Sequence, residues 1–292
     1  MSNSFGRVTL VARAAWPAIS RGATVLVPTG STEQHGPHLP FETDSVIAGA
    51  VAAAAAEHLA AVRLASERSG AVRSDSERVG HVLVAPTVTY GASGEHQAFA
   101  GTMSIGQDAL RMLLVELVRS LSTWAGRVVF VNGHGGNVAS LASAVRQLRD
   151  EGHNAAWVPC AGRPGAASER AADRRTTDAR TTDARTTDAR TADYPRDYAP
   201  DAHAGRTETS LMLHLAPADV ALDRLEPGNT EPLSLLMRDL SEGGVAAVSP
   251  NGILGDPRGA TAAEGEALFE QIVDTVVRRI GADRPNEHGL LQ

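Results

Sequence analysis

The chain has 292 residues, 27 of them basic and 34 acidic, and every basic residue is arginine. The absence of lysine excludes a Schiff-base lysine, a pyridoxal phosphate enzyme and a lysine-bearing phosphate loop. A net charge of -7 gives no basis for binding a phosphate backbone, and the single cysteine, Cys160, excludes an internal disulfide and a thiolate cage for zinc. We therefore expect no nucleic-acid partner.

Membrane and export signals are weak in this sequence. The longest apolar run, residues 46–56, is shorter than the roughly 20 residues that a bilayer-spanning helix needs. The N-terminus lacks a basic start, a solid apolar stretch and a small-residue cleavage site. These features predict a cytoplasmic protein without a membrane span.

Short apolar runs alternate with longer helical patterns along the chain. In chain order they predict a strand over 23–28, a helix over 45–59, a strand over 81–90, a helix over 107–124, a strand over 127–131, and helices over 138–150, 207–215 and 260–280. Strands that are apolar on both faces and separated by helices indicate a mostly parallel sheet covered on both sides. The predicted fold class is an α/β sandwich.

Residues 162–200 differ in composition from the rest of the chain. The unit TTDAR occurs three times in succession from residue 176 to residue 190, and large apolar side chains are almost absent. Such a segment cannot bury enough surface to offset its ordering entropy. We predict one domain over 1–292, interrupted by a disordered insert at 162–200 that has no catalytic role.

Polar loops follow the predicted strands, at the sheet edge where parallel α/β folds bind ligands. GSTEQHGPH follows the first strand, NGHGGN follows the third, and DAHAGRTETS lies beyond the insert. Each loop offers imidazole or carboxylate groups. The candidate ligands are Glu33, His35, Asp44, His134, His203 and Glu208.

Histidine and carboxylate ligands without cysteine suit Zn, Mn or Fe(II), and two such ions that share a carboxylate can activate a water. The pattern predicts a two-metal hydrolase. Taken singly, Asp44 could be a helix N-cap, and Glu33 and Glu208 could be solvated charges.

A serine hydrolase is disfavoured because the chain has no G-x-S-x-G motif. Cys160 has no motif around it and is expected to be structural.

The remaining histidines fall into two sets. His38 lies in the first ligand-rich loop and His96 ends the stretch YGASGEH, and whether either joins the site is left open. Five others lie in predicted helices, a strand or the C-terminal tail and are predicted to be structural: His58, His81, His153, His214 and His288.

The motifs together resemble a known family. GSTEQHGPHLP followed by Asp44, then YGASGEH with FAGT, NGHGGN, HAGRTETS and GDPRGAT, resemble the creatininase family of metal-dependent amidohydrolases along nearly the whole chain. The stretches YGASGEHQAFAGT, VFVNGHGGN and GGVAAVSPNGILGDP are most similar to the branch that matures the peptide-derived redox cofactor mycofactocin. The resemblance implies a three-layer α/β/α fold, two divalent metal ions and hydrolysis of an amide bond.

By motif position, the resemblance implies that Glu33, His35, Asp44 and His134 are metal ligands, with Asp44 as the bridge. Creatininase has a further glutamate ligand two residues after the histidine of the NGH motif, where this chain has Gly136. Glu208 of HAGRTETS is the carboxylate that the motifs place best to fill this gap.

The mycofactocin branch implies a peptidase that cuts a radical-modified precursor peptide near its C-terminus and releases a crosslinked valine-tyrosine unit. By resemblance, His203 moves a proton to the departing amine, a role that suits imidazole. Ser93 in YGASGEH matches a substrate-contacting position. Relatives also imply a homo-oligomer.

Two other functions stay open from the sequence. One is hydrolysis of a small cyclic amide or a formamide, for which a tight aromatic cage is expected. The chain has three tryptophans, Trp16, Trp124 and Trp157, and none lies in a ligand motif, which favours the peptide. The other is a non-catalytic metal-binding partner that docks the peptide, which needs the ligands but no proton shuttle.

Overall fold

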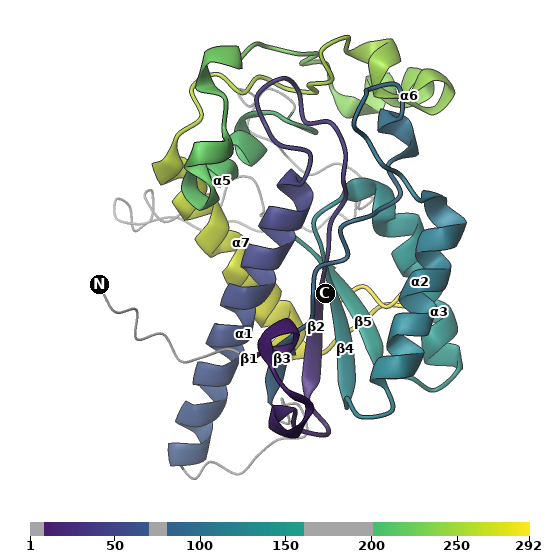
Figure 1. Cartoon of the computed structure of the whole chain (residues 1–292), viewed down its shortest axis with the longest axis vertical. Coiled ribbons are helices and arrows are strands. Elements are labelled where there is room, and N and C mark those ends of the chain that lie inside the picture. The colour runs from purple at the N-terminus through teal and green to yellow at the C-terminus, as the bar shows by residue number, and fades with distance from the viewer. Residues whose placement is uncertain (1–8, 70–80, 161–200) are drawn as a thin grey trace, which may run out of the picture.

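A computed structural model describes residues 9–69, 81–160 and 201–292 (Figure 1). The predicted insert at 162–200 lies outside the described residues. The strands are β1 (Thr9–Leu10), β2 (Thr24–Thr29), β3 (Val82–Val84), β4 (Arg127–Asn132) and β5 (Ala155–Pro159). The longer helices are α1 (Thr43–Ser69), α2 (Gly106–Leu121), α3 (Val138–Asp150), α5 (Arg206–Leu215), α6 (Leu233–Val248) and α7 (Ala262–Ala282).

The five strands form one parallel sheet in the order β1-β3-β2-β4-β5. The central pair β2 and β4 is in register from Thr24 opposite Arg127 to Thr29 opposite Asn132. Because both strands run the same way and end together, the loops that follow them begin side by side. The two ligand-rich loops of the sequence are therefore neighbours.

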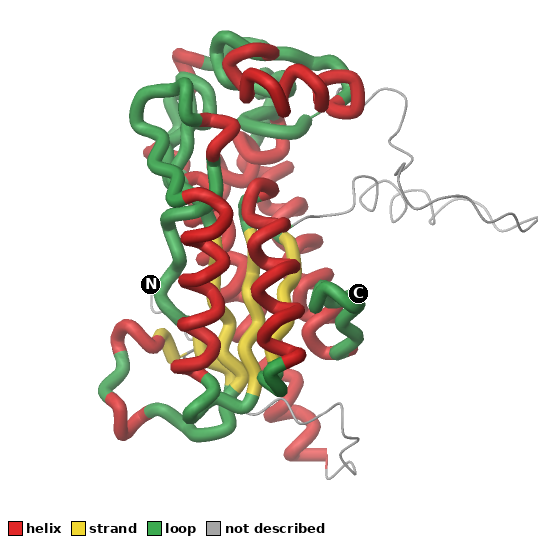
Figure 2. Tube along the Cα trace, turned by 90° about the vertical axis from the view of Figure 1, so that its right-hand side faces the viewer, coloured by secondary structure: helices red, strands yellow, loops and turns green. Residues whose placement is uncertain are grey.

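Helices cover both faces of the sheet, which confirms the α/β/α sandwich (Figures 1 and 2). On one face Leu26 and Val129 pack with buried residues of α1, α5 and α7. On the other, Val27 and Phe130 pack with buried residues of α2 and α3. Alternate strand residues thus enter separate cores, so every β2 and β4 residue is buried, as the continuous apolar runs predict.

Several elements differ in extent from the sequence prediction. The strand predicted over 81–90 shortens to β3, because Pro86 has no N–H for the ladder, and pairing resumes only as one bridge between Thr29 and Val88. Helix α1 continues ten residues beyond the predicted end at 59. The strands β1 and β5 and the helix α6 were not predicted.

The stretch Thr43–Arg63 of helix α1 is long and apolar enough to cross a membrane, with a mean hydropathy of 1.6. No other described helix meets these criteria. In this structure 44% of the apolar stretch is buried, and the helix packs against β2, β3, α5 and α7. A buried core helix of a globular domain has the same length and composition, so this feature alone is weak evidence for a membrane span.

Candidate metal centre

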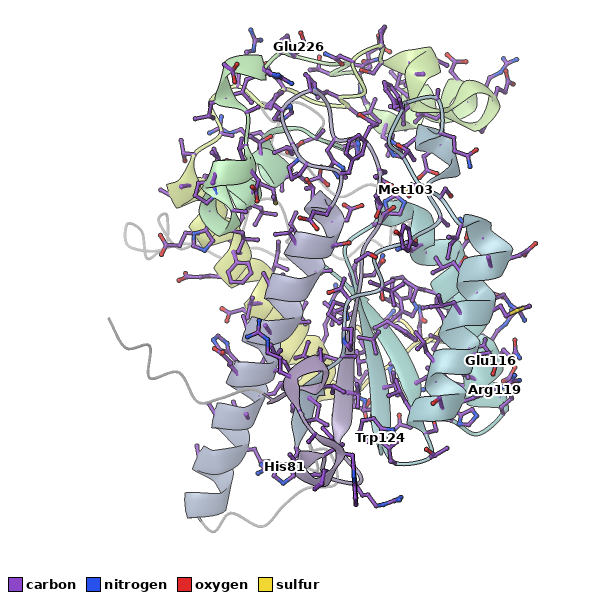
Figure 3. The ribbon with its side chains drawn as sticks, viewed as in Figure 1. His81, Met103, Glu116, Arg119, Trp124 and Glu226 are labelled. Carbon is purple, nitrogen blue, oxygen red and sulfur yellow. The ribbon has the colours of Figure 1, made fainter. Side chains whose placement is uncertain are left out.

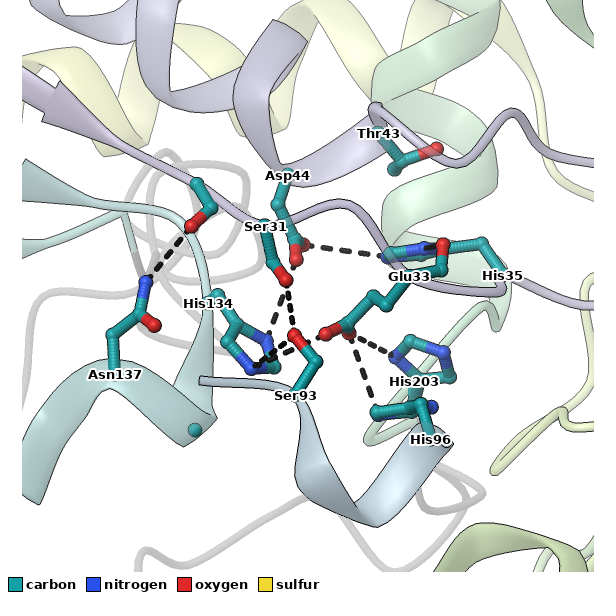
Figure 4. A network of polar contacts seen from close by, with 12 residues as sticks. Ser31, Glu33, His35, Thr43, Asp44, Ser93, His96, His134, Asn137 and His203 are labelled. Atoms are coloured by element: carbon teal, nitrogen blue, oxygen red, sulfur yellow. Dashed lines mark hydrogen bonds and ion pairs between the residues drawn. The ribbon is translucent and has the colours of Figure 1, made fainter. Parts of the chain in front are cut away.

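The six candidate ligands meet at the carboxyl ends of β2 and β4. Glu33 and His35 lie in the loop after β2, Asp44 lies in the first turn of α1, and His134 follows β4. His203 and Glu208 flank the start of α5. Segments that are far apart in the sequence therefore supply one compact cluster, as Figure 4 shows for five of the six.

Three groups of these residues could hold a metal ion. They are Glu33 with Asp44 and His134, His35 with Asp44 and Glu208, and Glu33 with His35 and His203. Within each group, the possible ligand atoms lie within 4.8 Å of one another. Asp44 belongs to two groups, so its two oxygens can face two different ions.

Backbone carbonyls orient the two central imidazoles. His35 can donate its Nδ1–H to the Glu33 carbonyl oxygen at 3.1 Å, which leaves Nε2 at 3.3 Å from Asp44 Oδ1 (Figure 4). His134 can donate its Nε2–H to the Ala92 carbonyl oxygen at 3.2 Å, which leaves Nδ1 at 3.4 Å from Asp44 Oδ2. A histidine that ligates a metal usually has its other nitrogen held in this way.

The carboxylates are buried without hydrogen-bond partners. Glu33 is fully buried, and neither of its side-chain oxygens has one; Asp44 Oδ2 and His35 Nε2 also lack one. Burying charged groups unpaired is costly, and native structures avoid it with partners or metal ions. Ring nitrogens of His134 and His96 lie 3.2 and 3.4 Å from the Glu33 oxygens.

The electrostatics of the metal-free cluster follow from these contacts. Burial opposes a charge on His35, but the carboxylates of Asp44, Glu208 and Glu33 together outweigh it and raise the histidine pKa to about 10. Burial likewise opposes a charge on His134, while Glu33 and Asp44 raise its pKa to about 9. Burial would raise the pKa of Glu33, yet the histidines around it, chiefly His134, hold that pKa far below its usual range. In the metal-free cluster, the positive charges of protonated His35 and His134 thus balance the negative charges of the carboxylates.

A backbone carbonyl also binds one ring nitrogen of His203, as in the two central imidazoles. It donates Nε2–H to the Gln34 carbonyl oxygen at 2.7 Å, and its Nδ1 lies 3.7 Å from Glu33 Oε1. Burial and the neighbouring His35 lower the pKa of His203 to about 4. Its ring centroid lies 4.3 Å from that of His96.

The structure places the two undecided histidines differently. His96 joins the cluster: its Nε2 faces Glu33, and its Nδ1 accepts a hydrogen bond from Gln34 Nε2 at 2.9 Å. His38 is buried nearby, with Nε2 at 2.9 Å from Thr209 Oγ1, and like His96 it belongs to none of the three groups. Nothing in the sequence singled out Gln34, whose side chain links the first loop to His96.

Gly136 cannot carry a side chain at this position of the backbone. A Cβ there would lie 2.3 Å from His134 Nε2 and 2.7 Å from Glu95 Oε1. The Glu95 carboxylate, which sequence reasoning did not single out, occupies the adjoining space at 3.6 Å from His134 Nε2. On the other side of the cluster, Glu208 Oε2 lies 3.9 Å from His35 Nε2, so the acid chosen from the sequence does reach the ligands.

Ser93 lies at the edge of the cluster and is fully buried. Its hydroxyl contacts that of Ser31, and its Oγ is 3.4 Å from His134 Nε2. A substrate contact for this residue stays a prediction.

None of the five histidines predicted to be structural belongs to a metal-capable group among the described residues. His81 precedes β3 at the end of the sheet opposite the site, where Figure 3 shows it near Trp124 and far from Glu226. Cys160, just beyond β5, packs against the core. Burial and the nearby Asp44 raise the pKa of its thiol, which disfavours a thiolate nucleophile.

A cavity of about 480 Å³ opens beside the cluster. Asp44, His134, His203 and Glu208 form its polar side, and side chains of α6 form an apolar side. A substrate in this cavity would contact both the candidate ligands and the apolar side.

Comparison with known proteins identifies the family. The sequence model of the creatininase family, described as creatinine amidohydrolase, matches residues 12–280. The chain belongs to the creatininase family. It is 49% identical over 267 residues to the mycofactocin precursor peptide peptidase of Mycolicibacterium smegmatis, covering 91% of this chain and 88% of that protein. With the protein of the same name from Mycobacterium tuberculosis H37Rv it shares 46% over 272 residues, covering 93% and 90%.

More distant members of the family share the fold. The creatinine amidohydrolase of Pseudomonas putida is 26% identical over 276 residues, covering 89% of this chain and 90% of that protein. A solved structure described as creatinine amidohydrolase (creatininase) superposes with a TM-score of 0.65 at 24% identity, covering 96% of this chain and all of that one. Another, described as "Creatininase Mn", has a TM-score of 0.66 with the same identity and coverage. A third is a mutant creatininase of "Zn-Zn type".

Proposed function

We propose that this protein is a metal-dependent peptidase that hydrolyses an amide bond of the mycofactocin precursor peptide. The observation that carries the proposal is the 46 to 49% identity, over about nine-tenths of the chain, to relatives named for that reaction. The cluster of buried ligands supports it, because the activity needs a site of this kind. The proposed cut lies near the C-terminus of the radical-modified peptide and releases its crosslinked valine-tyrosine unit.

The proposed metal ligands divide between two divalent ions. Glu33 and His134 would hold one, His35 and Glu208 the other, and Asp44 would bridge them. The donor set fits: the cluster buries carboxylate oxygens and an imidazole nitrogen that have no hydrogen-bond partner, and ions would satisfy them. Imidazole and carboxylate donors suit Zn, Fe(II) and Mn alike.

When bound, two such ions supply a Lewis acid for the scissile carbonyl and an activated water. The residues of the chain supply proton transfer. The Gln34 carbonyl fixes the tautomer of His203, so Nδ1 points toward Glu33 and stays available as an acceptor. We assign to Nδ1 the uptake of the proton that the attacking water loses and its transfer to the departing amine, in line with the role of positioned imidazoles in amide cleavage. Ser93 would help to position the substrate through its contact with the cluster.

The shape of the site favours a peptide over a small ring. Among the residues that line the cavity there is no tryptophan, and Trp16 is 86% exposed. A small cyclic amide would need close aromatic walls, whereas the observed cavity has room for several side chains. A cytoplasmic location and a homo-oligomer stay predictions.

Mass spectrometry of the radical-modified precursor peptide tests the proposal. The metal-loaded protein should release a C-terminal valine-tyrosine fragment, and protein stripped with a chelator should not. The variant His203→Ala should keep its metal and lose turnover, while His153→Ala, which alters a histidine far from the cluster, should cleave at the wild-type rate. Intact peptide with both ions bound would redirect the search to cyclic amides and formamides. Unchanged cleavage by His203→Ala would exclude the assigned proton transfer.

A further inference from the structure

The cavity beside the metal-capable cluster has a second side with a different chemistry. Its apolar side is made by Leu233, Met237, Leu240 and Val245 of α6, together with Leu254. Residues 233, 237 and 240 follow one another at helical spacing, so one face of α6 is turned toward the site. Apolar side chains therefore line the same cavity as Glu208 and His203.

Helix α6 is anchored to the segment that carries part of the cluster. Gly244 interrupts the helix with a φ of +69°, and a Cβ there would lie 2.6 Å from the Glu95 carbonyl oxygen. Only glycine permits this backbone conformation and this close approach at little cost. Val245, just after it, is buried with Leu236 and Leu254. The position of the apolar side is thus fixed relative to η4 (Gly94–His96), which supplies His96.

The apolar side is open in the structure. Leu233 is 42% exposed and Met237 is 53% exposed, although both face the cavity. Figure 1 shows α6 at the same end of the molecule as the loop between β2 and α1. Burial of such side chains against an apolar group is favourable because it removes apolar surface from water. An apolar group bound here would also keep its neighbouring amide close to the ligands.

We propose that Leu233, Met237 and Leu240 form a subsite for the apolar side chain of a residue that flanks the scissile amide. This inference rests on the proposed peptidase function and adds its specificity. The side chain binds the α6 face, and the amide next to it lies over the cluster. The subsite selects aliphatic or aromatic residues because a charged side chain would lose its hydration against these three residues without a partner.

Helix α6 provides a matched pair of variants for the test. Met237 lines the cavity, whereas Leu235, on the same helix, is 68% exposed and does not line it. For the precursor peptide, Met237→Ala should lower kcat/KM by about tenfold, the lower end of what one missing apolar contact in a pocket costs. Leu235→Ala should match the wild type. Both variants should bind the same amount of zinc per chain as the wild type, which excludes loss of the metal site.

Substrate variants make the test specific for contact. The precursor peptide is prepared with each residue that flanks the cut replaced in turn by alanine. The wild type and Met237→Ala are then both assayed on each peptide. For one of these positions, Met237→Ala should lower kcat/KM little further than the alanine in the peptide already does. The reason is that either change removes the same contact. Additive losses at every position would overturn the subsite.

The outcomes separate the two proposals. Wild-type protein that binds zinc and leaves the peptide intact would overturn the peptidase function and the subsite with it. Cleavage by the wild type with equal rates for Met237→Ala and Leu235→Ala would overturn the subsite alone. Equal losses in both variants, with a change in molecular mass by light scattering, would show that α6 contacts a second copy and would likewise overturn it.

Discussion

Metal binding should displace protons from the buried cluster, and the structure indicates how many. In the metal-free protein, neighbouring carboxylates raise the pKa of His35 to about 10 and that of His134 to about 9. At about pH 7.5 both imidazoles are charged, and each must lose its proton to coordinate an ion. Loading both ions should therefore release about two protons per chain.

Calorimetric titration with zinc measures this release. The observed heat is recorded in buffers of different ionisation enthalpy, and its slope against that enthalpy gives the number of protons. Near pH 10 to 11 the same titration should release fewer, since the histidines are then largely neutral. Tight binding at about pH 7.5 without proton release would refute the reasoning, because the histidines would already be neutral.

The same pKa values set the pH dependence of the metal-free fold. Both are raised above the ordinary histidine value of 6.5, so the stabilisation from these ion pairs is complete below about pH 6.5. It should disappear as the pH rises through 9 and 10. Urea unfolding of the stripped protein across this range measures the loss.

The remaining predictions concern a ligand, the core and the cysteine. Glu208→Gln should lower metal content below two ions per chain by elemental analysis, and full occupancy would mean that another group is the fifth ligand. Phe130→Ala, at a fully buried position, should reduce the free energy of unfolding by about 3–5 kcal/mol in urea titrations of the loaded protein; a loss below about 1 kcal/mol would contradict its packing. Cys160→Ser should retain activity, and the wild-type thiol should react with a disulfide reagent much more slowly in the folded than in the unfolded chain.

Much of the fold could be predicted because its signals are local. Strands β2 and β4 are short apolar runs buried on both faces, and α3 begins and ends where its pattern does, at residues 138 and 150. Helix α6 was missed because its exposed Leu235 and Met237 break the amphipathic pattern, and their placement depends on the contact of Gly244 with Glu95. Tertiary contacts of this kind leave no periodic signal.

The residues of the site likewise divide into those with a local sequence signal and those without one. Glu33, His35 and His134 stand out because they follow apolar strands in loops rich in glycine, and the parallel pairing of β2 with β4 brings them together. Gln34 and Glu95 could not be found from spacing, since their roles depend on which way their side chains point. The apolar side of the cavity could not be found either, although Val245 and Leu254 lie in the stretch GGVAAVSPNGILGDP, because nothing in that stretch indicates which side chains line a cavity.

The spread of the ligands along the chain also sets an order of events during synthesis. Glu33, Asp44 and His134 are present once the ribosome has translated the loop after β4, whereas Glu208 follows only with α5. At roughly 5–20 residues per second, the second half of the centre is translated several seconds after the first. A nascent chain that ends before α5 contains all three residues of one metal-capable group, so the two proposed ions can enter this protein one after the other.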